Sequence, residues 1–451
     1  MRVAIIGCGR VGLVTGACLA AAGHEVKCAD RDQELLQGLQ QGRLPFFESH
    51  LDQVIRQALA SRKLTFSSDT SETSRACDVI FLCVGVPHLE NGDADFSALD
   101  AAARQIAESA ESPKLVVERS TVPLQTGEQL KQLLAVYNRG RGARFRVAAN
   151  PQFLREGTAV NDFLHPDRIL VGVDDPESEE LLRQIYGPIL RQEFSCPIHA
   201  NGCPPRESPE FLVTGVRSAE LIKHAANAFL AVKISYANVL ADLCERLDAN
   251  VQEVTQAIGL DPRIRPHLLR AGLGFGGSRL PRDLQTFRRL AERAGVDAGI
   301  LRATEEVNRS RLESFLKKIG KALWVLKDKQ IALLGLAYKP GTDDIRDSPA
   351  IQLLQRLLAA GARVRAYDPQ AMPTARAALP GIVCAASAYE AAESADALLV
   401  ATEWEEFRDL DWQRIRDLMA RPLILDARNL LSPSHMKSLG FEYESVGRPD
   451  S

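Results

Sequence analysis

Short apolar runs rich in β-branched residues alternate with longer amphipathic segments through the first third of the chain. Runs of this length are typical of buried strands, and the segments between them have the period of helices. This alternation predicts an α/β domain built on a doubly wound parallel sheet. The expected strands are residues 3–6, 25–29, 79–84, 115–117, 145–148 and 169–173.

The pattern changes in the middle of the chain. From Ser218 to about Leu247 a helical period runs without interruption, with alanines on every face, and further helical sequence extends to Leu326. A second alternation of apolar runs and amphipathic segments begins at Lys329 and predicts another sheet. Its expected strands are residues 331–334, 363–367, 397–401 and 423–425.

We therefore expect two Rossmann-like, doubly wound parallel-sheet domains joined by a central helical domain with a long helix. Residues 201–210 contain three prolines and no hydrophobic period, which predicts a linker after the first sheet. The expected division is a first sheet domain over residues 1–200, the linker and helical domain over 201–326, and a second sheet domain over 327–451.

The charge composition argues against nucleic acid and membranes as binding partners. The 451 residues carry a net charge of -3 with 25% charged side chains of both signs, so no overall field would draw the chain onto nucleic acid or an anionic membrane. The chain enters a predicted strand at Arg2, which leaves no room for a signal peptide, and no later apolar run is long enough to cross a bilayer. We expect a cytoplasmic protein.

Nine cysteines, an odd number, are scattered through predicted strands and helices, as expected of reduced thiols rather than a disulfide framework. Cys196, His199 and Cys203 have the spacing of metal ligands. Only three ligands are visible in this segment, whereas a closed tetrahedral site needs four. We expect ordinary loop residues there and no metal site.

A glycine fingerprint marks the start of the first domain. Residues 7–12, Gly-Cys-Gly-Arg-Val-Gly, follow a predicted strand and open a predicted helix. Gly7 permits the tight turn, Gly9 lets the backbone approach a pyrophosphate, and Gly12 allows close packing of helix on strand. Asp30, at the end of the next strand, would accept hydrogen bonds from ribose hydroxyls and repel a 2′-phosphate, so the expected cofactor is NAD. The arginine after it could favour NADP instead, but a solvated surface charge is its simpler role.

Longer motifs follow in the same order as in a known family. They are residues 84–87 (Val-Gly-Val-Pro), 119–123 (Arg-Ser-Thr-Val-Pro), 150–157 (Asn-Pro-Gln-Phe-Leu-Arg-Glu-Gly), 220–223 (Glu-Leu-Ile-Lys), 274–283 (Gly-Phe-Gly-Gly-Ser-Arg-Leu-Pro-Arg-Asp), 335–346 and 426–429. Together they resemble the UDP-glucose/GDP-mannose dehydrogenase family over nearly the whole chain. The resemblance implies an NAD-binding first domain, a dimerising central domain and a nucleotide-sugar-binding last domain. The motif Gly-Phe-Gly-Gly-Ser is more similar to the UDP-glucose and GDP-mannose branches of the family than to the branch that oxidises N-acetylhexosamines, which favours a UDP-hexose substrate.

Members of that family oxidise a primary alcohol of the sugar to an aldehyde and then to a carboxylate, passing two hydrides to two NAD molecules. For the first step, the resemblance implies that Lys223, Asn227 and Asp283 hold a water near the sugar hydroxyl, with Thr121 assisting. Independently of the family, Lys223 and Asn227 are four residues apart in a predicted helix, so their side chains share one face. All the groups for alcohol oxidation are therefore present.

The second step departs from the family pattern. It needs a thiolate to trap the aldehyde, but the position of the family's nucleophilic cysteine is Arg279, whose guanidinium stays protonated and has no electron pair for attack. The first carboxylate of the family pattern is Gln152, a neutral amide that cannot act as a base, although Glu156 remains. Both losses fall on the step from aldehyde to acid.

The resemblance also implies binding residues. Those expected at the cofactor are Gly7, Gly9, Arg10, Val11, Gly12, Asp30, Val84, Gly85, Ser120, Thr121 and Arg346. Those expected at the substrate are Phe153, Leu154, Lys223, Asn227, Arg263, Phe275, Gly276, Lys339 and Arg428. Arg263 matches an arginine that the family donates across a dimer interface, so a homodimer is expected.

Three functions stay open at this point. One is an NAD-dependent enzyme that oxidises the sugar alcohol of a UDP-hexose and stops at, or returns from, the carbonyl. The second is full oxidation to the acid without a covalent intermediate. The third is a protein that binds NAD and a nucleotide-sugar without turnover; the presence of Lys223, Asn227 and Asp283 argues against it, because a binding protein does not need them.

Overall fold

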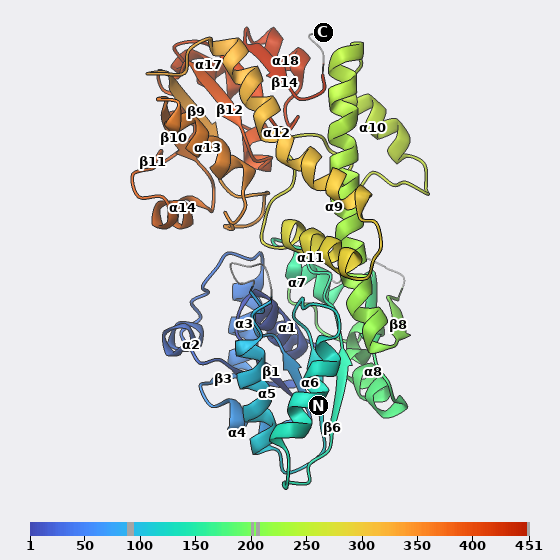
Figure 1. Ribbon diagram of the computed structural model, residues 1–451. Coiled ribbons are helices and arrows are strands. Elements are labelled where there is room, and N and C mark those ends of the chain that lie inside the picture. Colours follow the sequence, from blue (N-terminus) through green and yellow to red (C-terminus); the bar gives the residue numbers. More distant parts are fainter. Residues whose placement is uncertain (88–93, 200–202, 204–207, 449–451) are drawn as a thin grey trace. The chain divides into compact units, whose positions relative to one another are not determined.

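The computed structural model describes residues 1–87, 94–199, 203 and 208–448. By its internal contacts the chain divides into two units, Met1–Lys223 and His224–Ser451. Each unit contains one sheet, and the long helix α9 (Val216–Leu247) begins in the first unit and ends in the second (Figure 1).

The first unit is built on an eight-stranded sheet with the strand order β3-β2-β1-β4-β5-β6-β7-β8. Every strand expected in this region is present, and β3 and β8 are additional. The strands are β1 Arg2–Ile6, β2 Glu25–Ala29, β3 Leu64–Ser67, β4 Val79–Leu82, β5 Lys114–Glu118, β6 Phe145–Ala149, β7 Arg168–Gly172 and β8 Glu210–Thr214. The expected linker over residues 201–210 lies mostly outside the described residues, and Glu210 already opens β8.

Helices cover both faces of this sheet because alternate residues of its strands are buried on opposite sides. Val3 and Ile5 of β1 belong to a core shared with α1 and α3, whereas Ala4 and Ile6 belong to a second core shared with α5 and α6. The helices are α1 Arg10–Ala21, α2 Gln33–Gln40, α3 Leu51–Ala60, α4 Thr70–Arg75, α5 Ser97–Ser109, α6 Thr126–Tyr137, α7 Ala159–Leu164 and α8 Pro176–Leu190.

The expected parallel direction holds through six strands and changes at the seventh. β6 pairs with β7 in the antiparallel sense at Ala149 and Gly172, and β7 and β8 are parallel to each other. A parallel neighbour requires a crossover that covers a face of the sheet. The connection from β6 to β7 carries only the six-residue helix α7, so the chain reverses direction instead.

The second unit contains a six-stranded parallel sheet with the order β11-β10-β9-β12-β13-β14. All the strands expected here are present, with two more at the sheet edges. They are β9 Gln330–Leu334, β10 Arg363–Tyr367, β11 Val383–Cys384, β12 Ala397–Val400, β13 Leu423–Asp426 and β14 Glu442–Ser445. Ile331 and Leu333 face one core, and Ala332 and Leu334 face the other.

The helical sequence in the middle of the chain forms α9, α10 Val251–Gly259, α11 Leu280–Arg293 and α12 Gly299–Leu323. The helices of the second sheet are α13 Pro349–Ala359, α14 Met372–Ala378, α15 Ala388–Ala392, α16 Glu405–Arg408, α17 Trp412–Leu418 and α18 Pro433–Ser438. Among the described residues, no helix combines the length and apolar character that a membrane span requires.

Candidate active site

The fingerprint loop has the geometry expected of a dinucleotide site. Gly7 adopts a φ of 100°, and a Cβ on Gly12 would lie 1.8 Å from the carbonyl oxygen of Gly7, so neither position accepts a side chain. A Cβ on Gly9 would meet nothing within 4 Å. Gly9 is the N-cap of α1, and the space beside it is therefore open at a helix N-terminus, where a phosphate is stabilised.

The carboxylate of Asp30 is held at the end of β2. Oδ2 accepts a 2.7 Å hydrogen bond from the backbone N–H of Cys8, and Oδ1 accepts one of 3.1 Å from that of Asp32. Arg10 lies over the ring of Phe46, with 4.5 Å between guanidinium carbon and ring centroid. The bond from Cys8 connects the fingerprint loop to the end of β2, the position from which an acidic side chain reaches a ribose.

Two neighbouring loops complete the carboxyl edge of the sheet. Val84 and Gly85 follow β4, and Ser120 and Thr121 follow β5. The hydroxyl of Ser120 donates a 2.6 Å hydrogen bond to the carbonyl of Val84. Strand order reverses between β1 and β4, so these loops lie at the switch point where open α/β sheets bind ligands.

The loop after β6 contains Gln152, one of the two departures from the family pattern. Its side chain is 2% exposed, and Oε1 accepts a 2.8 Å hydrogen bond from the backbone N–H of Leu154. Glu156, which the pattern keeps, is also buried. The amide thus helps to shape the loop but, unlike a carboxylate, offers no base there.

Lys223 is buried, and its ammonium lies 5.1 Å from the ring centroid of Phe153. The guanidinium carbon of Arg168 lies 4.2 Å from the same centroid. The negative face of the aromatic ring stabilises positive charge that has been removed from water. This environment keeps a cation inside the first unit, beside the loop that carries Gln152.

The second unit brings together Asn227 and Asp283, which are far apart in sequence. Nδ2 of Asn227 donates a 2.6 Å hydrogen bond to Oδ2 of Asp283, whose side chain is completely buried. Nε of Arg282 lies 3.5 Å from the other carboxylate oxygen. The amide of Asn227 and the guanidinium of Arg282 offset part of the free-energy cost of burying this carboxylate, but Oδ1 has no hydrogen-bond partner among the described residues.

The loop that leads to Arg279 has a fixed backbone. The N–H of Gly277 donates to the carbonyl of Arg346 at 3.0 Å, and Asn308 both accepts from and donates to the backbone of Phe275. A Cβ on Gly276 would lie 2.2 Å from the carbonyl oxygen of Asp347. Arg279 follows this loop as the N-cap of α11, so its side chain starts from a defined backbone; its correspondence to the family's cysteine stays a prediction.

The basic residues expected at ligands make contacts with the protein. Arg346 forms a two-point ion pair with Asp344, and the exposed Arg263 pairs with Asp261. Nζ of Lys339 donates to the carbonyl of Pro340 at 3.2 Å. Their expected roles at cofactor and substrate stay predictions.

Arg428 has a structural role that sequence analysis did not foresee. Its guanidinium donates to the carbonyl oxygens of Ala401, Gly274 and Tyr338 at 2.8, 3.3 and 3.4 Å, and lies 3.4 Å from the carboxylate of Glu403. Arg428 thereby joins the loop before Arg279 to the loops at the carboxyl ends of β9 and β12 in the second sheet.

Sequence analysis also missed a buried pair of carboxyl groups, Glu118 at the end of β5 and Glu220 on α9. Glu220 accepts hydrogen bonds from the backbone N–H groups of Gln125 and Gly127 at 2.7 and 2.8 Å. Burial raises the pKa of Glu118 well above its usual range, and the neighbouring charge of Glu220 raises it further. This environment therefore favours the protonated form of Glu118. No local pattern marks the pair, because its members come from distant segments.

Several cysteines are poor candidates to replace the missing nucleophile. Burial raises the pKa of the thiols of Cys18, Cys77, Cys83 and Cys244. The thiolate is the nucleophilic form, and these environments disfavour it.

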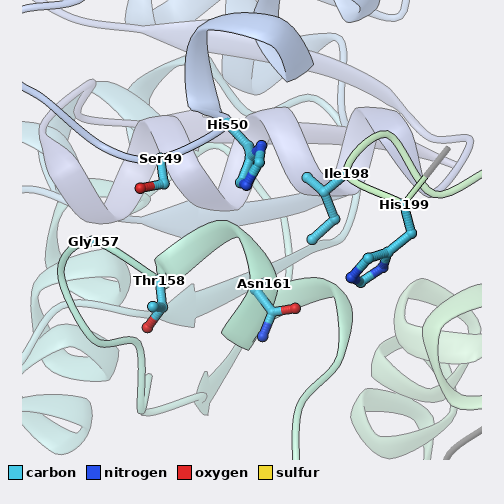
Figure 2. A pocket seen from close by; sticks show the side chains of 7 residues that line it. All are labelled: Ser49, His50, Gly157, Thr158, Asn161, Ile198 and His199. Atoms are coloured by element: carbon cyan, nitrogen blue, oxygen red, sulfur yellow. The ribbon is translucent and has the colours of Figure 1, made fainter. Parts of the chain in front are cut away.

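A hollow of about 380 Å³ lies in the first unit, away from the fingerprint loop in sequence (Figure 2). It is lined by Ser49, His50, Gly157, Thr158, Asn161, Ile198 and His199. The segment around Ile198 and His199 thus approaches the start of α7.

A dinucleotide fingerprint at the switch point of one sheet, together with a second Rossmann-like sheet, defines an NAD-dependent oxidoreductase. Three family models match consecutive parts of the chain: the NAD-binding domain of the UDP-glucose/GDP-mannose dehydrogenase family at residues 1–190, its central domain at 217–310 and its UDP-binding domain at 332–433. The chain belongs to this family.

Relatives match over the full length. The chain is 42% identical over 454 residues to the UDP-glucose 6-dehydrogenase of Rhizobium meliloti, covering 100% of both chains. It is 41% identical to the enzyme of that name from Pseudomonas aeruginosa, covering 100% of this chain and 98% of the relative. A solved UDP-glucose dehydrogenase from Pyrobaculum islandicum superposes with a TM-score of 0.87 at 32% identity, covering 100% of this chain and 97% of that one.

Proposed function

We propose that this protein oxidises the primary alcohol of a UDP-hexose with NAD and stops at, or returns from, the carbonyl stage. One observation carries the proposal: Arg279 occupies the position where the family pattern has its nucleophilic cysteine, and Gln152 replaces the first carboxylate. The alcohol-oxidising residues Lys223, Asn227 and Asp283 are all retained.

The first oxidation transfers a hydride from the alcohol carbon to NAD and releases the hydroxyl proton, which yields an aldehyde, NADH and a proton. Lys223 is a buried cation suited to stabilising the alkoxide that develops at the sugar oxygen. Asp283 and Asn227 offer a buried acceptor and an amide that can orient a water as proton carrier. The three side chains thus supply a positive charge, a proton acceptor and a hydrogen-bond donor, which are the groups that this step requires.

The second oxidation requires a different set of groups. In the family's route a thiolate adds to the aldehyde, a second hydride leaves the thiohemiacetal, and water hydrolyses the resulting thioester. An arginine cannot add to a carbonyl, because its guanidinium stays protonated. The aldehyde therefore leaves the site, or the bound NADH reduces it again. An epimer forms when the carbon next to the carbonyl loses its proton and regains one on the other face before that reduction.

The identity of the substrate is inferred from the relatives. The proteins from Rhizobium meliloti and Pseudomonas aeruginosa are named UDP-glucose 6-dehydrogenases, and this chain matches them from end to end. The match of the UDP-binding domain at residues 332–433 supports a uridine diphosphate as the carrier of the sugar. UDP-glucose is the substrate to test first.

The test is to supply UDP-glucose and NAD, count the NADH formed per sugar consumed, and identify the sugar product by mass spectrometry. We expect at most one NADH per sugar, with an aldehyde or an epimer as product. Two NADH with a uronate would mean full oxidation without a covalent intermediate, and would overturn the proposal. Binding of both ligands without turnover would overturn it in favour of a non-catalytic protein.

We also propose that the protein is a homodimer formed through its central helices. Phe229, Tyr236 and Leu243 recur about every two turns of α9 and are 63%, 53% and 47% exposed in the single chain. A row of large apolar side chains along one helix face is typical of a surface covered by another chain.

A further inference from the structure

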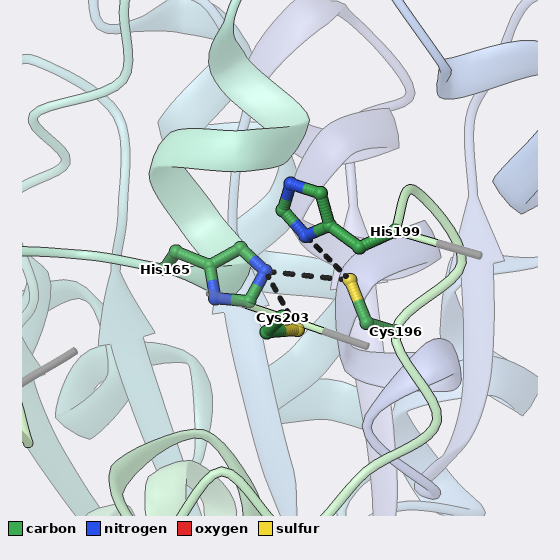
Figure 3. A group of neighbouring side chains, drawn as sticks. All are labelled: His165, Cys196, His199 and Cys203. Atoms are coloured by element: carbon green, nitrogen blue, oxygen red, sulfur yellow. Dashed lines mark hydrogen bonds between the residues drawn. The ribbon is translucent and has the colours of Figure 1, made fainter. Parts of the chain in front are cut away.

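Four metal-ligating side chains converge in the first unit, away from the residues assigned to the reaction. His165 directly follows α7, and Cys196, His199 and Cys203 follow α8 (Figure 3). One nitrogen or sulfur atom from each of the four lies within 4.8 Å of the corresponding atom of every other. The sequence shows three of these ligands close together, from which no metal site was expected. The fourth, His165, lies 31 residues before Cys196 and completes a set of four.

Three of the distances between ligand atoms are close to those of a tetrahedral metal centre, and the others are within 4.8 Å. Nε2 of His165 lies 3.3 Å from Sγ of Cys196 and 3.5 Å from Sγ of Cys203, and Nδ1 of His199 lies 3.4 Å from Sγ of Cys196. In a tetrahedral zinc site, with Zn–N near 2.0–2.1 Å and Zn–S near 2.3 Å, a nitrogen and a sulfur ligand are about 3.6 Å apart. The side chains need to move little to hold an ion between them.

We propose that His165, Cys196, His199 and Cys203 bind a zinc ion in a closed structural site. Two thiolates and two imidazoles at tetrahedral spacing favour zinc over magnesium, calcium or manganese, which prefer oxygen ligands. Four protein ligands leave no open coordination position, so the ion does not take part in the reaction. This site is independent of the proposed function.

The position of the ligands explains what the ion does. Between α8 and β8 the described residues form no helix or strand, and three ligands come from this connection. The fourth comes from the end of α7, the helix that follows the loop of Gln152 and Glu156. The zinc ion fastens the connection to that helix. Because a preformed site rarely exists in the unfolded chain, the free energy of zinc binding adds to the stability of the fold.

Burial also suits a metal site. His165 is buried, whereas Cys196, His199 and Cys203 are half-buried, which leaves an entry path for the ion. The rings of His165 and His199 lie 5.1 Å apart between centroids, and that of His165 lies 6.0 Å from Phe194. A disulfide between Cys196 and Cys203 would account for the two sulfurs but not for two imidazoles beside them.

The experiment measures metal in the full chain, purified under reducing conditions without a histidine tag or a chelator. We expect one zinc ion per protein chain by elemental mass spectrometry. In both Cys196→Ser and Cys203→Ser the zinc content should fall at least tenfold. Cys384→Ser, which changes a half-buried cysteine of β11 in the other unit, is the matched control and should keep its zinc.

Cobalt(II) substitution of the unaltered protein gives a second readout that does not depend on the variants folding. We expect the intense visible bands of tetrahedral cobalt and a thiolate-to-cobalt charge-transfer band in the near ultraviolet. The proposal is overturned if the unaltered protein binds neither metal, if the two cysteine variants keep as much zinc as the unaltered protein, or if peptide mapping finds Cys196 and Cys203 joined as a disulfide. The number of NADH formed per sugar tests the proposed function separately.

Discussion

The side-chain amide of Asn227 donates a 2.6 Å hydrogen bond to the carboxylate of Asp283, which is completely buried in the second unit. The two residues come from different helices, α9 and the first turn of α11. A buried carboxylate with so few partners is costly to keep for structure alone. The pair is therefore the first target for mutation.

Replacing Asp283 by Asn should lower the rate of NADH formation about 100-fold or more, because the variant loses the proton acceptor but keeps a similar shape. The control is Asp297→Asn, which changes an exposed carboxylate in the same unit and should leave the rate unchanged. The rate is measured as NADH absorbance with UDP-glucose, and NAD affinity by titration. Equal rates in the two variants would remove Asp283 from the chemistry.

Substitutions at two fingerprint glycines should have different effects, one on NAD binding and the other on the stability of the fold. Gly9→Ala adds a methyl group to open space, so the melting temperature should not change, whereas NAD binding should weaken about tenfold or more because the methyl group blocks the pyrophosphate. Gly12→Ala forces a methyl group to 1.8 Å from the carbonyl oxygen of Gly7 and should destabilise the fold by about 1–3 kcal/mol. Calorimetry of binding and of unfolding checks both; a stable Gly12→Ala variant would contradict the prediction.

Introducing the cysteine and the carboxylate of the family pattern should produce the second oxidation that we propose this protein lacks. The double variant Arg279→Cys with Gln152→Glu supplies a thiol for attack and a carboxylate for hydrolysis, so two NADH per sugar and a uronate should appear. The matched control, Arg279→Ser with Gln152→Glu, lacks the thiol and should make no more acid than the unaltered protein. Trapping of an acyl adduct on the new cysteine would directly support a thioester route in the variant. If the double variant makes no acid, Arg279 and Gln152 are not the residues that prevent the second oxidation.

The buried pair of Glu118 and Glu220 should make stability depend on pH. Because the folded-state pKa of Glu118 is raised, the stabilisation from its bound proton is complete below the unfolded pKa of about 4.3 and is lost as pH rises toward the folded value. Glu118→Gln cannot ionise, so it should raise the melting temperature by several degrees at about pH 8 and by less at about pH 5. Glu128→Gln, at a partly exposed carboxylate, is the control. A gain that is the same at both pH values would contradict the buried proton.

The apolar row on α9 should be needed for dimerisation. Tyr236→Glu combined with Leu243→Glu places two charges in that row and should halve the mass measured by light scattering after gel filtration. Val136→Glu, at a similarly exposed apolar residue on α6, should not change the mass. A chain that is monomeric before any substitution would reject the proposed dimer.

Hydrophobic periodicity alone was enough to locate the sheets. Every strand expected from it is present, because buried strands of a parallel sheet must be apolar on both faces and leave a local signal. The four strands it missed lie at the ends of the two strand orders: β3 and β8 in the first sheet, and β11 and β14 in the second. The antiparallel direction of β7 also left no signal in the local sequence, because the direction of a strand depends on how the connection before it packs.

The sequence by itself determined the chemistry that is available: the fingerprint of residues 7–12, the acidic residue Asp30, and an arginine rather than a thiol at position 279. These are statements about residue type and short spacing, which the chain carries without folding. Only the tertiary structure decided that Arg428 braces a loop, that Glu118 meets Glu220, and that His165 joins three ligands from a distant segment. Those relationships depend on chain segments that fold back on one another, and no local pattern records such a meeting.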